Sequence, residues 1–275
     1  MAGKILKCSY TILAVTLAVL LPESCQDVIN VDLRNAAPRI VIEGSVSNLS
    51  DSVIVAVHFS TDFYTPESIT PVNDAVLTLK DSAGTDHPLS RVADGIYKAG
   101  NISAKPGDIF DLVIAEAGNS YTSVATMPVL VKIDSVFITR DPDRRDGDVV
   151  NVRIKDPAGI PDYYQFEIFR NDSLLNTGNN FIIVSDKYFD GKTGSLPIGG
   201  RRLGINTFNS GDRITVRMKN IEKWMYDYLD ILRSITNQEA IFSITTPANP
   251  PGNISGNALG YFSANSISVK TIIKQ

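Results

Sequence analysis

The sequence predicts an all-β (mainly β) protein with two tandem β-sandwich domains and one amphipathic helix inserted in the second. Short segments rich in Val, Ile and Thr follow one another, separated by turn residues, and 19 Gly and 14 Pro are spread along the chain. The 275 residues, 43% of them hydrophobic, are long for one domain and sufficient for two cores. A single segment, residues 221–236, shows clear helical spacing.

The first 24 residues have the three parts of an export signal. Lys4 and Lys7 precede an apolar run from Tyr10 to Leu21, and Pro-Glu-Ser then leads to Cys25. The apolar run covers about a dozen residues, whereas a helix that crosses a bilayer needs about 20. We therefore expect residues 1–24 to be a signal peptide that is removed, not a membrane anchor.

Two cleavage sites compete at the end of this signal. An ordinary signal peptidase requires small residues at the first and third positions before the cut, and residues 22–24 offer one small residue. The alternative resembles a bacterial lipobox, in which a Leu-rich stretch and a small residue precede a Cys that is lipidated. Leu20, Leu21 and Ser24 fit this pattern, while Glu23 departs from it.

The number of cysteines favours the lipobox. The chain has two Cys, and Cys8 leaves with the signal under either alternative, so the mature chain can form no internal disulfide. A single free thiol suits an oxidising compartment poorly. We therefore expect Cys25 to carry the lipid, palmitate or a similar acyl chain. Several acyl chains buried in a bilayer hold a protein there almost irreversibly. The alternative is an incidental Cys at the end of a signal.

A polar tether, residues 25–38, is expected to precede the N-terminal β-sandwich domain, residues 39–129. Val53, Val55 and Val57 alternate with other side chains, as in a strand with one buried face. Six or seven strands fit one immunoglobulin-like or fibronectin-III-like sandwich. The predicted strands cover residues 39–46, 53–60, 75–81, 95–100, 108–118 and 120–127.

The C-terminal β-sandwich domain is expected to cover residues 130–275. Predicted strands lie at 131–139, 148–156, 163–171 and 213–220, and a closing pair at 258–264 and 266–274, with an irregular segment from 176 to 211. In the helix, apolar residues recur from Ile221 to Ile235 at i, i+3, i+4 and i+7, and Asn220 is the expected N-cap. This stripe contains the one Trp, Trp224, and could be a ligand platform. We expect it to be the face that packs on the sheet.

Several kinds of chemistry find little support. A net charge of −4 with 20% charged residues provides no basic surface, so nucleic acid is not expected as a partner. The two histidines, His58 and His87, lie on different predicted elements without metal-ligand spacing. Residues 189–195 contain Gly-Lys-Thr, but Asp186 stands where a phosphate loop has its first Gly. We therefore expect no catalytic residues, cofactor or metal, although two of the 30 acids could still converge for glycosidase work.

Residues 141–148 contain four Asp and suggest calcium or a turn. Asp141, Asp143, Asp146 and Asp148 provide carboxylates, but an EF-hand loop has Gly at position six and Glu at position twelve. Gly147 arrives one residue late, and position twelve is Val152. A hairpin turn at Asp146-Gly147 is the favoured interpretation, and calcium at Asp141–Asp148 is left open.

Two sets of residues are candidates for contact or modification. The irregular segment offers ligand contacts, since loops carry much recognition. Asp-Ser followed by a small or aliphatic residue is similar to the O-glycosylation acceptor pattern of Bacteroidota, although Asp-Ser is also common in turns. The contact candidates are Tyr188, Phe189, Arg201 and Arg202, and the O-glycosylation candidates are Ser52, Ser82, Ser135 and Ser173.

Several segments, in this order, resemble the Bacteroidota lipoprotein family called domain of unknown function 4249. They are CQDVINVDL, IVIEGSV, PVNDAVLTLKDSAG, GIYKAG, GDIFDLVIAEAGNSYTSVATMP, VKIDSV, DPAGIPDYYQFEI and PPGNISGNALGYFSA. The resemblance implies an outer-membrane lipoprotein of unknown activity, in organisms whose surface lipoproteins often work beside TonB-dependent transporters. It also implies a first domain similar to immunoglobulin-like or carboxypeptidase-regulatory-like sandwiches. It supplies no functional residues.

The expected function is therefore a non-catalytic binding or accessory lipoprotein. The lipid bilayer is the expected partner through acylated Cys25, and a TonB-dependent outer-membrane transporter or a surface complex is the expected protein partner. An envelope polymer hydrolase and a structural spacer are the alternatives. The expected location is the outer membrane, with the periplasmic and cell-surface faces both open.

Overall fold

The computed structural model describes residues 37–61, 69–140, 147–178, 180–200, 207–236 and 249–275. The predicted signal peptide, Cys25 and most of the tether lie outside these residues, as do Asp141, Asp143, Asp146, Arg201 and Arg202. Among the described residues, no helix has both the length and the apolar character needed to cross a membrane.

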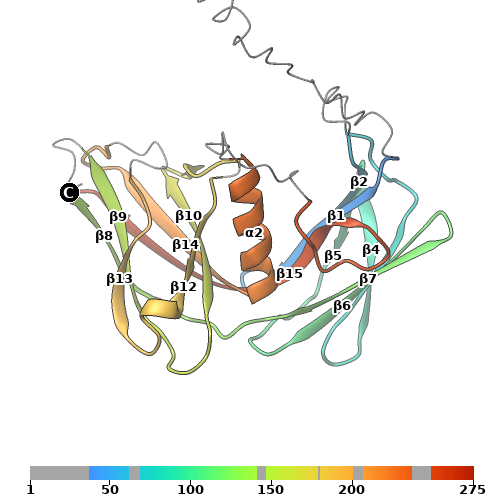
Figure 1. The fold of residues 1–275 in the computed structure, drawn as a ribbon, viewed down its shortest axis with the longest axis horizontal. Helices are drawn as coiled ribbons and strands as arrows, with labels where there is room; N and C mark the ends of the chain where they lie inside the picture. Colours follow the sequence, from blue (N-terminus) through green and yellow to red (C-terminus); the bar gives the residue numbers. More distant parts are fainter. Residues whose placement is uncertain (1–36, 62–68, 141–146, 179, 201–206, 237–248) are drawn as a thin grey trace, which may run out of the picture. The chain divides into compact units, whose positions relative to one another are not determined.

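The prediction of a mainly β sandwich protein with one inserted helix is confirmed (Figure 1). The first seven strands are β1 (Ile40–Ser47), β2 (Val53–Phe59), β3 (Val76–Lys80), β4 (Asp86–Ala93), β5 (Ile96–Ala99), β6 (Ile109–Glu116) and β7 (Asn119–Thr126). The next six are β8 (Ile133–Arg140), β9 (Asp148–Lys155), β10 (Tyr163–Arg170), β11 (Ser173–Leu174), β12 (Ile182–Ser185) and β13 (Thr193–Pro197). The short 3₁₀ helix η2 (Asp186–Tyr188) lies between β12 and β13, and β14 (Arg213–Ile221), α2 (Lys223–Thr236) and β15 (Leu259–Ile273) follow.

The strands form two sheets. In the described residues the larger sheet has the order β11-β10-β14-β15-β1-β2-β5-β4-β3-β6-β7, with β12 paired to β10, and the smaller sheet has the order β13-β9-β8. The predicted hairpin between β8 and β9 exists as an antiparallel pair, from Ile133 opposite Ile154 to Arg140 opposite Asp148. The residues of its turn, 141–146, lie outside the described part of the chain.

β15 joins the two halves of the larger sheet. Its first half, Leu259–Asn265, runs parallel to β1, and its second half, from Ser266 to Ile273, runs antiparallel to β14. The prediction of two closing strands was therefore wrong. The strand continues through Asn265 and Ser266, whose side chains are both buried: Ser266 Oγ donates to the Pro128 carbonyl at 2.6 Å, and Asn265 Nδ2 donates to Ser263 Oγ at 3.1 Å.

In the part of the chain that the structure describes, the buried apolar side chains form three clusters. The first is built mainly by the alternating residues of β1 to β7, and the predicted Val53, Val55 and Val57 are all fully buried in it. The second is built by β8, β9, β10 and β14. The first cluster also contains Phe262 and Ala264 of β15. The predicted boundary between residues 129 and 130 falls between the two clusters along the chain, but the C-terminal strand contributes to both sides, and the boundary stays a prediction.

The third cluster fixes α2 on the sheet. Met225, Tyr228 and Leu229 lie on the buried face of α2 and cluster with Ile183 of β12. The helix packs against β10 and β12. The predicted apolar stripe therefore packs on the sheet. The predicted N-cap at Asn220 was wrong, because Asn220 lies inside β14, paired with Tyr164 and Ser266, and the helix begins at Lys223.

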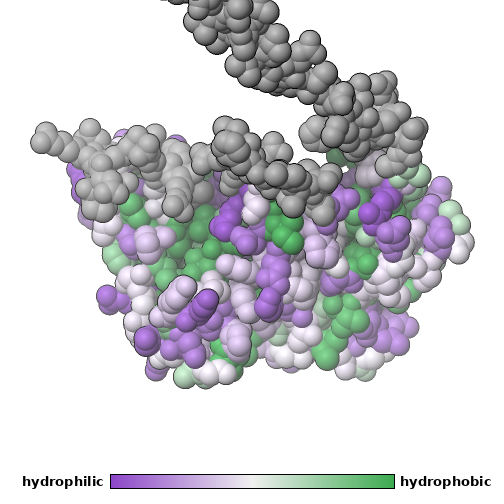
Figure 2. All heavy atoms as spheres, in the orientation of Figure 1, coloured by the Kyte–Doolittle hydropathy of each residue, from purple (hydrophilic) through white to green (hydrophobic). Residues whose placement is uncertain are grey.

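Four further strands were not predicted, and one of them, β11, has two residues. β4 contains Pro88 and is mostly exposed, with Leu89 as its buried side chain, so its polar sequence gave little strand signal. β12 and β13 lie within residues 176–211, which were expected to be irregular. Exposed large apolar side chains, such as Ile54, Val76 and Val124, are distributed over many elements. Figure 2 accordingly shows hydrophobic residues in separate areas among hydrophilic ones, as is normal for a protein surface.

Candidate functional site

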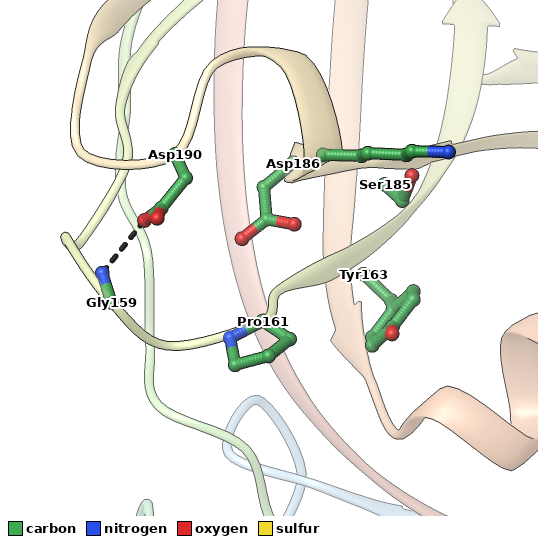
Figure 3. A pocket seen from close by; sticks show the side chains of 7 residues that line it. Gly159, Pro161, Tyr163, Ser185, Asp186 and Asp190 are labelled. Atoms are coloured by element: carbon green, nitrogen blue, oxygen red, sulfur yellow. Dashed lines mark hydrogen bonds between the residues drawn. The ribbon is translucent and has the colours of Figure 1, made fainter.

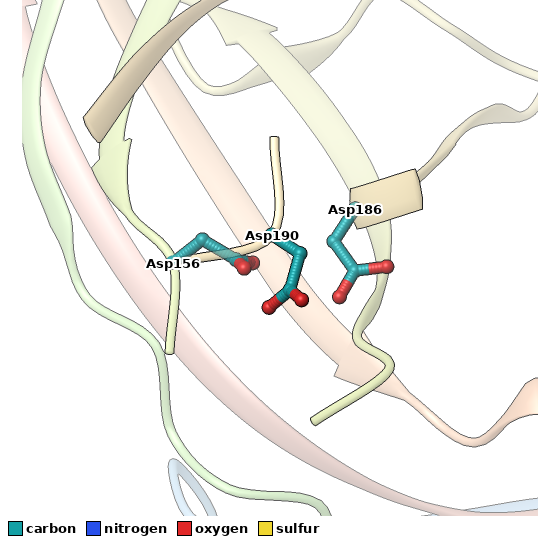
Figure 4. Close-up of side chains that lie close together, drawn as sticks. All are labelled: Asp156, Asp186 and Asp190. Carbon is teal, nitrogen blue, oxygen red and sulfur yellow. The ribbon is translucent and has the colours of Figure 1, made fainter. Parts of the chain in front are cut away.

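Four aspartates gather where two connecting segments meet at one end of the second cluster. Asp156 directly follows β9 and Asp162 directly precedes β10, so both belong to the β9–β10 connection. Asp186 begins η2, and Asp190 lies just after it. One carboxylate oxygen from each of Asp156, Asp186 and Asp190 lies within 4.8 Å of the others, and the three side chains converge in Figure 4.

Hydrogen bonds between the two segments hold these carboxylates in place. The Gly159 N–H donates to Asp190 Oδ1 at 2.7 Å, the Asp162 N–H donates to Asp186 Oδ2 at 2.8 Å, and the Gly191 N–H donates to Asp156 Oδ2 at 3.0 Å. Each bond crosses from one segment to the other. The carboxylates are therefore fixed by backbone donors of the opposite segment.

Two local features complete the arrangement. The Tyr164 hydroxyl, buried in β10, donates to Asp156 Oδ1. Gly191 has a φ of +70°, and a Cβ at this position would lie 2.7 Å from the Ala158 Cβ, so the close approach of the two segments requires glycine here.

The electrostatics of the cluster are unusual for exposed loops. Asp156, Asp162 and Asp186 are buried, while Asp190 is exposed. Burial, followed by repulsion from Asp156, Asp186 and Asp190, raises the pKa of Asp162 to about 7. Burial also raises the pKa of Asp156, although the bonds from Tyr164 and Gly191 oppose this shift. Carboxylate oxygens in this number are the ligands that hard cations prefer, so the cluster could hold a divalent cation.

A cavity of about 410 Å³ opens beside the cluster (Figure 3). Asp186 and Asp190 line it on one side, and Pro161 and Tyr163 line it on another. The cavity gives solutes access to the two carboxylates.

A larger groove of about 740 Å³ lies on the other side of Pro161 and Tyr163, which line both spaces. The groove runs between the start of α2, the end of β7 with the residues after it, and the β9–β10 connection. Its apolar and aromatic residues are Met127, Pro128, Val129, Ile160, Pro161, Tyr163, Ile221 and Trp224, and its ionisable residues are Asp162, Glu222, Lys223 and Asp227. Glu222 accepts a hydrogen bond from the Thr126 N–H at 3.1 Å, and burial raises the pKa of Glu222.

The predicted contact residues are only partly near these sites. Tyr188 is 83% exposed and directly follows Lys187, which lines the smaller cavity. Phe189 instead packs against the second core cluster, with its ring stacked on Tyr164 at a centroid distance of 6.3 Å, which argues against a free contact residue. Arg201 and Arg202 lie outside the described residues.

The predicted glycosylation serines have different environments. Ser173 in β11 is exposed, Ser52 and Ser135 are partly buried, and the Ser82 hydroxyl both donates to the Ile109 carbonyl at 3.1 Å and accepts from the Ile109 N–H at 2.6 Å. The Ser82 hydroxyl therefore already makes two hydrogen bonds with the backbone of Ile109. Modification of all four stays a prediction.

Neither histidine has a serine partner in the described part of the chain. His87 Nε2 lies 2.9 Å from Asp81 Oδ2, and His58 lies in β2, where it forms an isolated bridge with Pro71. These contacts give no Ser-His-acid arrangement among the described residues.

Asp148, the described one of the four aspartates in residues 141–148, has protein partners. Its Oδ2 accepts from the Phe208 N–H at 2.9 Å and lies 3.0 Å from the Lys274 ammonium. Burial alone would raise the pKa of Asp148, but the Phe208 hydrogen bond and Lys274 outweigh it and hold the pKa below 3.8. This carboxylate ties the start of β9 to the C-terminal end of the chain.

We expect Asp148→Asn to lower the free energy of unfolding by about 3 kcal/mol at pH 7, since it leaves Lys274 without its buried partner. Because the folded pKa of Asp148 is depressed, its contribution is present above pH 3.8 and is lost as the pH falls through the folded pKa. Urea unfolding at several pH values should show a smaller loss of stability in acid for the variant. The control Asp172→Asn, which breaks an exposed pair with Arg213, should cost less than about 1 kcal/mol. Equal costs for the two variants would contradict this role.

Sequence inspection missed the aspartate cluster, although its segments DPAGIPD and DKYFDGK both combine two Asp with turn residues. Each segment alone is typical of a loop, and only the pairing of β10 with β12 and of β9 with β13 brings them together. The groove was missed for the same reason, because its walls come from three distant stretches of sequence.

Solved structures that match this chain include three of low sequence identity and low TM-score. An adhesin, InvE, of Yersinia pseudotuberculosis is 14% identical over 66% of this chain, with a TM-score of 0.21, and this chain spans 55% of the adhesin chain. A two-domain fibronectin type-III segment of chicken tenascin is 12% identical over 67% of this chain and 91% of its own, with a TM-score of 0.21. The chicken CNTN1 FN1–FN3 domains are 10% identical over 67% of this chain and 60% of their own, with a TM-score of 0.25.

No curated protein matches the sequence. A family model matches residues 26–271, which is nearly all of the chain after the predicted signal and Cys25. The chain therefore belongs to the family described as Domain of unknown function (DUF4249).

Proposed function

We propose that this protein is a lipid-anchored outer-membrane component that binds a ligand or a protein partner without catalysing a reaction. The lipobox-like stretch before Cys25 supports the anchor, and the Bacteroidota lipoprotein context that the sequence resembles supports a TonB-dependent transporter or a surface complex as the partner. The periplasmic and cell-surface faces of the membrane remain alternatives for its position.

The groove beside α2 is the observation that carries the binding role. Its volume of about 740 Å³ falls within the range of about 300–1,000 Å³ that is typical of ligand sites. Apolar and aromatic side chains dominate its lining, and a few ionisable groups stand among them. Trp224 combines a large apolar surface with an N–H donor, and Trp is enriched among residues that dominate binding energy.

Site-specific photo-crosslinking tests this proposal. A photoreactive phenylalanine analogue replaces Lys223, an exposed residue that lines the groove, or Lys98, an exposed residue of β5 that serves as the control. In native membranes, irradiation should join the chain labelled at position 223 to an outer-membrane transporter or another envelope protein. The chain labelled at position 98 should give little of this adduct. Absence of an adduct at position 223, or equal adducts at both positions, would reject the groove as the binding surface.

An envelope polymer hydrolase is the second candidate, because Asp186 and Asp190 line one cavity and glycosidases use paired carboxylates. Release of new reducing ends from purified envelope polysaccharide by the wild-type protein, and not by Asp186→Asn, would support the enzyme over the binding protein. A structural spacer has less support, since a spacer requires no groove.

A further inference from the structure

We propose that Asp156, Asp186 and Asp190, together with Asp162, form a calcium site that joins the β9–β10 connection to η2 and the residues after it. The proposal goes beyond the binding role above and does not depend on it.

The geometry of the three carboxylates fits one ion. Calcium binds oxygen ligands at about 2.4 Å, so two oxygens on the same ion are at most about twice that distance apart. The oxygens of Asp156, Asp186 and Asp190 lie within 4.8 Å of one another, which meets this limit. The side chains converge on a common space between the two segments (Figure 4).

Hydrogen bonding leaves oxygens available for an ion. The Gly159 N–H donates to Asp190 Oδ1, and the Asp162 N–H donates to Asp186 Oδ2. The other oxygen of each carboxylate, Asp190 Oδ2 and Asp186 Oδ1, receives no hydrogen bond from the described residues. Both oxygens of Asp156 are used, but a carboxylate oxygen has a second lone pair. The N–H donors also orient the carboxylates from outside, as partners beyond the ligands do in metal sites.

Asp162 is an independent sign of a missing ligand. Its side chain is 4% exposed, and its Oδ2 has no hydrogen-bond partner among the described residues. A buried carboxylate oxygen without a partner costs free energy, and such groups are rare in folded proteins. Asp162 borders the cluster, because its own N–H donates to Asp186 Oδ2 at 2.8 Å. A cation at the cluster would supply the interaction that the described residues do not.

The cations of the described residues form no ion pair with the cluster. None of the ion pairs among the described residues includes any of the four carboxylates. Lys187 lines the adjacent cavity, but its ammonium lies over the Tyr188 ring, 5.5 Å from the ring centre. Up to four negative charges therefore gather without a positive partner from the described chain.

The ligand set indicates calcium among the common ions. The grouped side chains are all Asp, without His or Cys, which disfavours zinc. Calcium accepts irregular geometry and six to eight oxygens, whereas magnesium demands a near-ideal octahedron and keeps several waters. The carboxylates come from two connecting segments, and two of them are buried while the third is exposed. Such an irregular set of ligands suits calcium better than magnesium. Because Pro161 and Tyr163 line both the cavity and the groove, calcium would also fix one wall of the groove.

Titration calorimetry of the purified full-length chain, first freed of metal by a chelator, tests the site. We expect one Ca²⁺ per chain with a dissociation constant of about 1 mM or tighter, the range of extracellular calcium modules. Ca²⁺ should also raise the melting temperature, since it binds the folded state. Terbium should bind in its place, show luminescence when tyrosine is excited, and be displaced by Ca²⁺.

Matched variants assign the binding to these residues. Asp190→Asn and Asp186→Asn should each weaken Ca²⁺ binding at least about tenfold, and Tyr164→Phe, which removes the hydroxyl that positions Asp156, should weaken it about tenfold without changing the stoichiometry. Asp94→Asn is the control, because Asp94 is also an exposed Asp before a Gly of positive φ, paired with Arg91. Its Ca²⁺ binding should equal that of the wild type.

Three results would overturn the proposal. They are the absence of heat and of any melting shift with millimolar Ca²⁺, equal binding by Asp190→Asn and Asp94→Asn, and equal affinity for Mg²⁺ and Ca²⁺. Asp190 is exposed, so Asp190→Asn should fold and give a clear answer even where Asp186→Asn does not. None of these results bears on the lipid anchor or on crosslinking at the groove.

Discussion

Replacing Gly260 with alanine should destabilise the protein by about 4 kcal/mol or more, a loss at the extreme of single substitutions. Gly260 lies in β15 opposite Ile42 of β1 and has a φ of +93°. A Cβ there would lie 2.1 Å from the Ile42 carbonyl oxygen and 2.9 Å from its carbon. Because backbone atoms cannot rotate aside as a side chain can, the parallel pairing of β1 with β15 would have to open.

The measurement is urea unfolding followed by circular dichroism, with Gly84→Ala as the control. Gly84 has a φ of +81°, but no atom lies within 4 Å of its ideal Cβ, so alanine there should cost only the conformational strain of about 1–2 kcal/mol. Both positions have a positive φ, and they differ in the clash that a Cβ would make. If Gly260→Ala unfolds at the same urea concentration as Gly84→Ala, this result would contradict the close approach of β15 to β1 at Gly260.

The second large effect is expected for Phe262→Ala, at about 3–5 kcal/mol. Phe262 is fully buried in the first core cluster, although it lies near the C-terminal end of the chain. Gly44 of β1 leaves room for its ring, since a Cβ on Gly44 would lie 3.2 Å from Phe262 Cδ2. Truncation to alanine should leave a cavity between β1 and β15.

The location of the damage distinguishes this account from general destabilisation. Amide hydrogen exchange should accelerate in β1, which is paired with β15 in the sheet, and in β2, which is paired with β1, although both strands are distant from residue 262 in sequence. Val269→Ala on the same strand, where the side chain is 44% exposed, should change the free energy of unfolding by less than about 0.5 kcal/mol. Faster exchange confined to residues 130–275 in Phe262→Ala would mean that β15 does not belong to the first core cluster.

Much of the fold could be predicted from the sequence because most strands have one buried face. Period-two alternation of the Val53 to Val57 kind marks β2, and similar patterns mark β1, β6, β9, β10 and β14. The alternation fails where burial does not alternate. β4 is almost entirely exposed, and β15 is buried on both sides through its centre, from Phe262 to Ile267.

The candidate sites could not be predicted because they depend on contacts between distant residues. Asp156 and Asp190 are 34 positions apart in the sequence, and each lies in a segment that resembles an ordinary turn. Residues 141–148, where a turn was favoured and calcium was left open, contain four aspartates in eight positions, yet the described member Asp148 is held by Lys274 and the Phe208 N–H. The density of acidic residues along the chain is thus a poor guide to where carboxylates converge.

The proposed location of this protein depends on one covalent modification that we propose, the lipid at Cys25. The mass of the N-terminal peptide of the mature protein, purified from outer membranes of its native host, measures this directly. We predict a peptide that begins at Cys25 and is heavier than its amino acids by several acyl chains, and a Cys25→Ser chain that leaves the membrane fraction. An unmodified peptide that begins at another residue would contradict the anchor and, with it, the proposed location and partner.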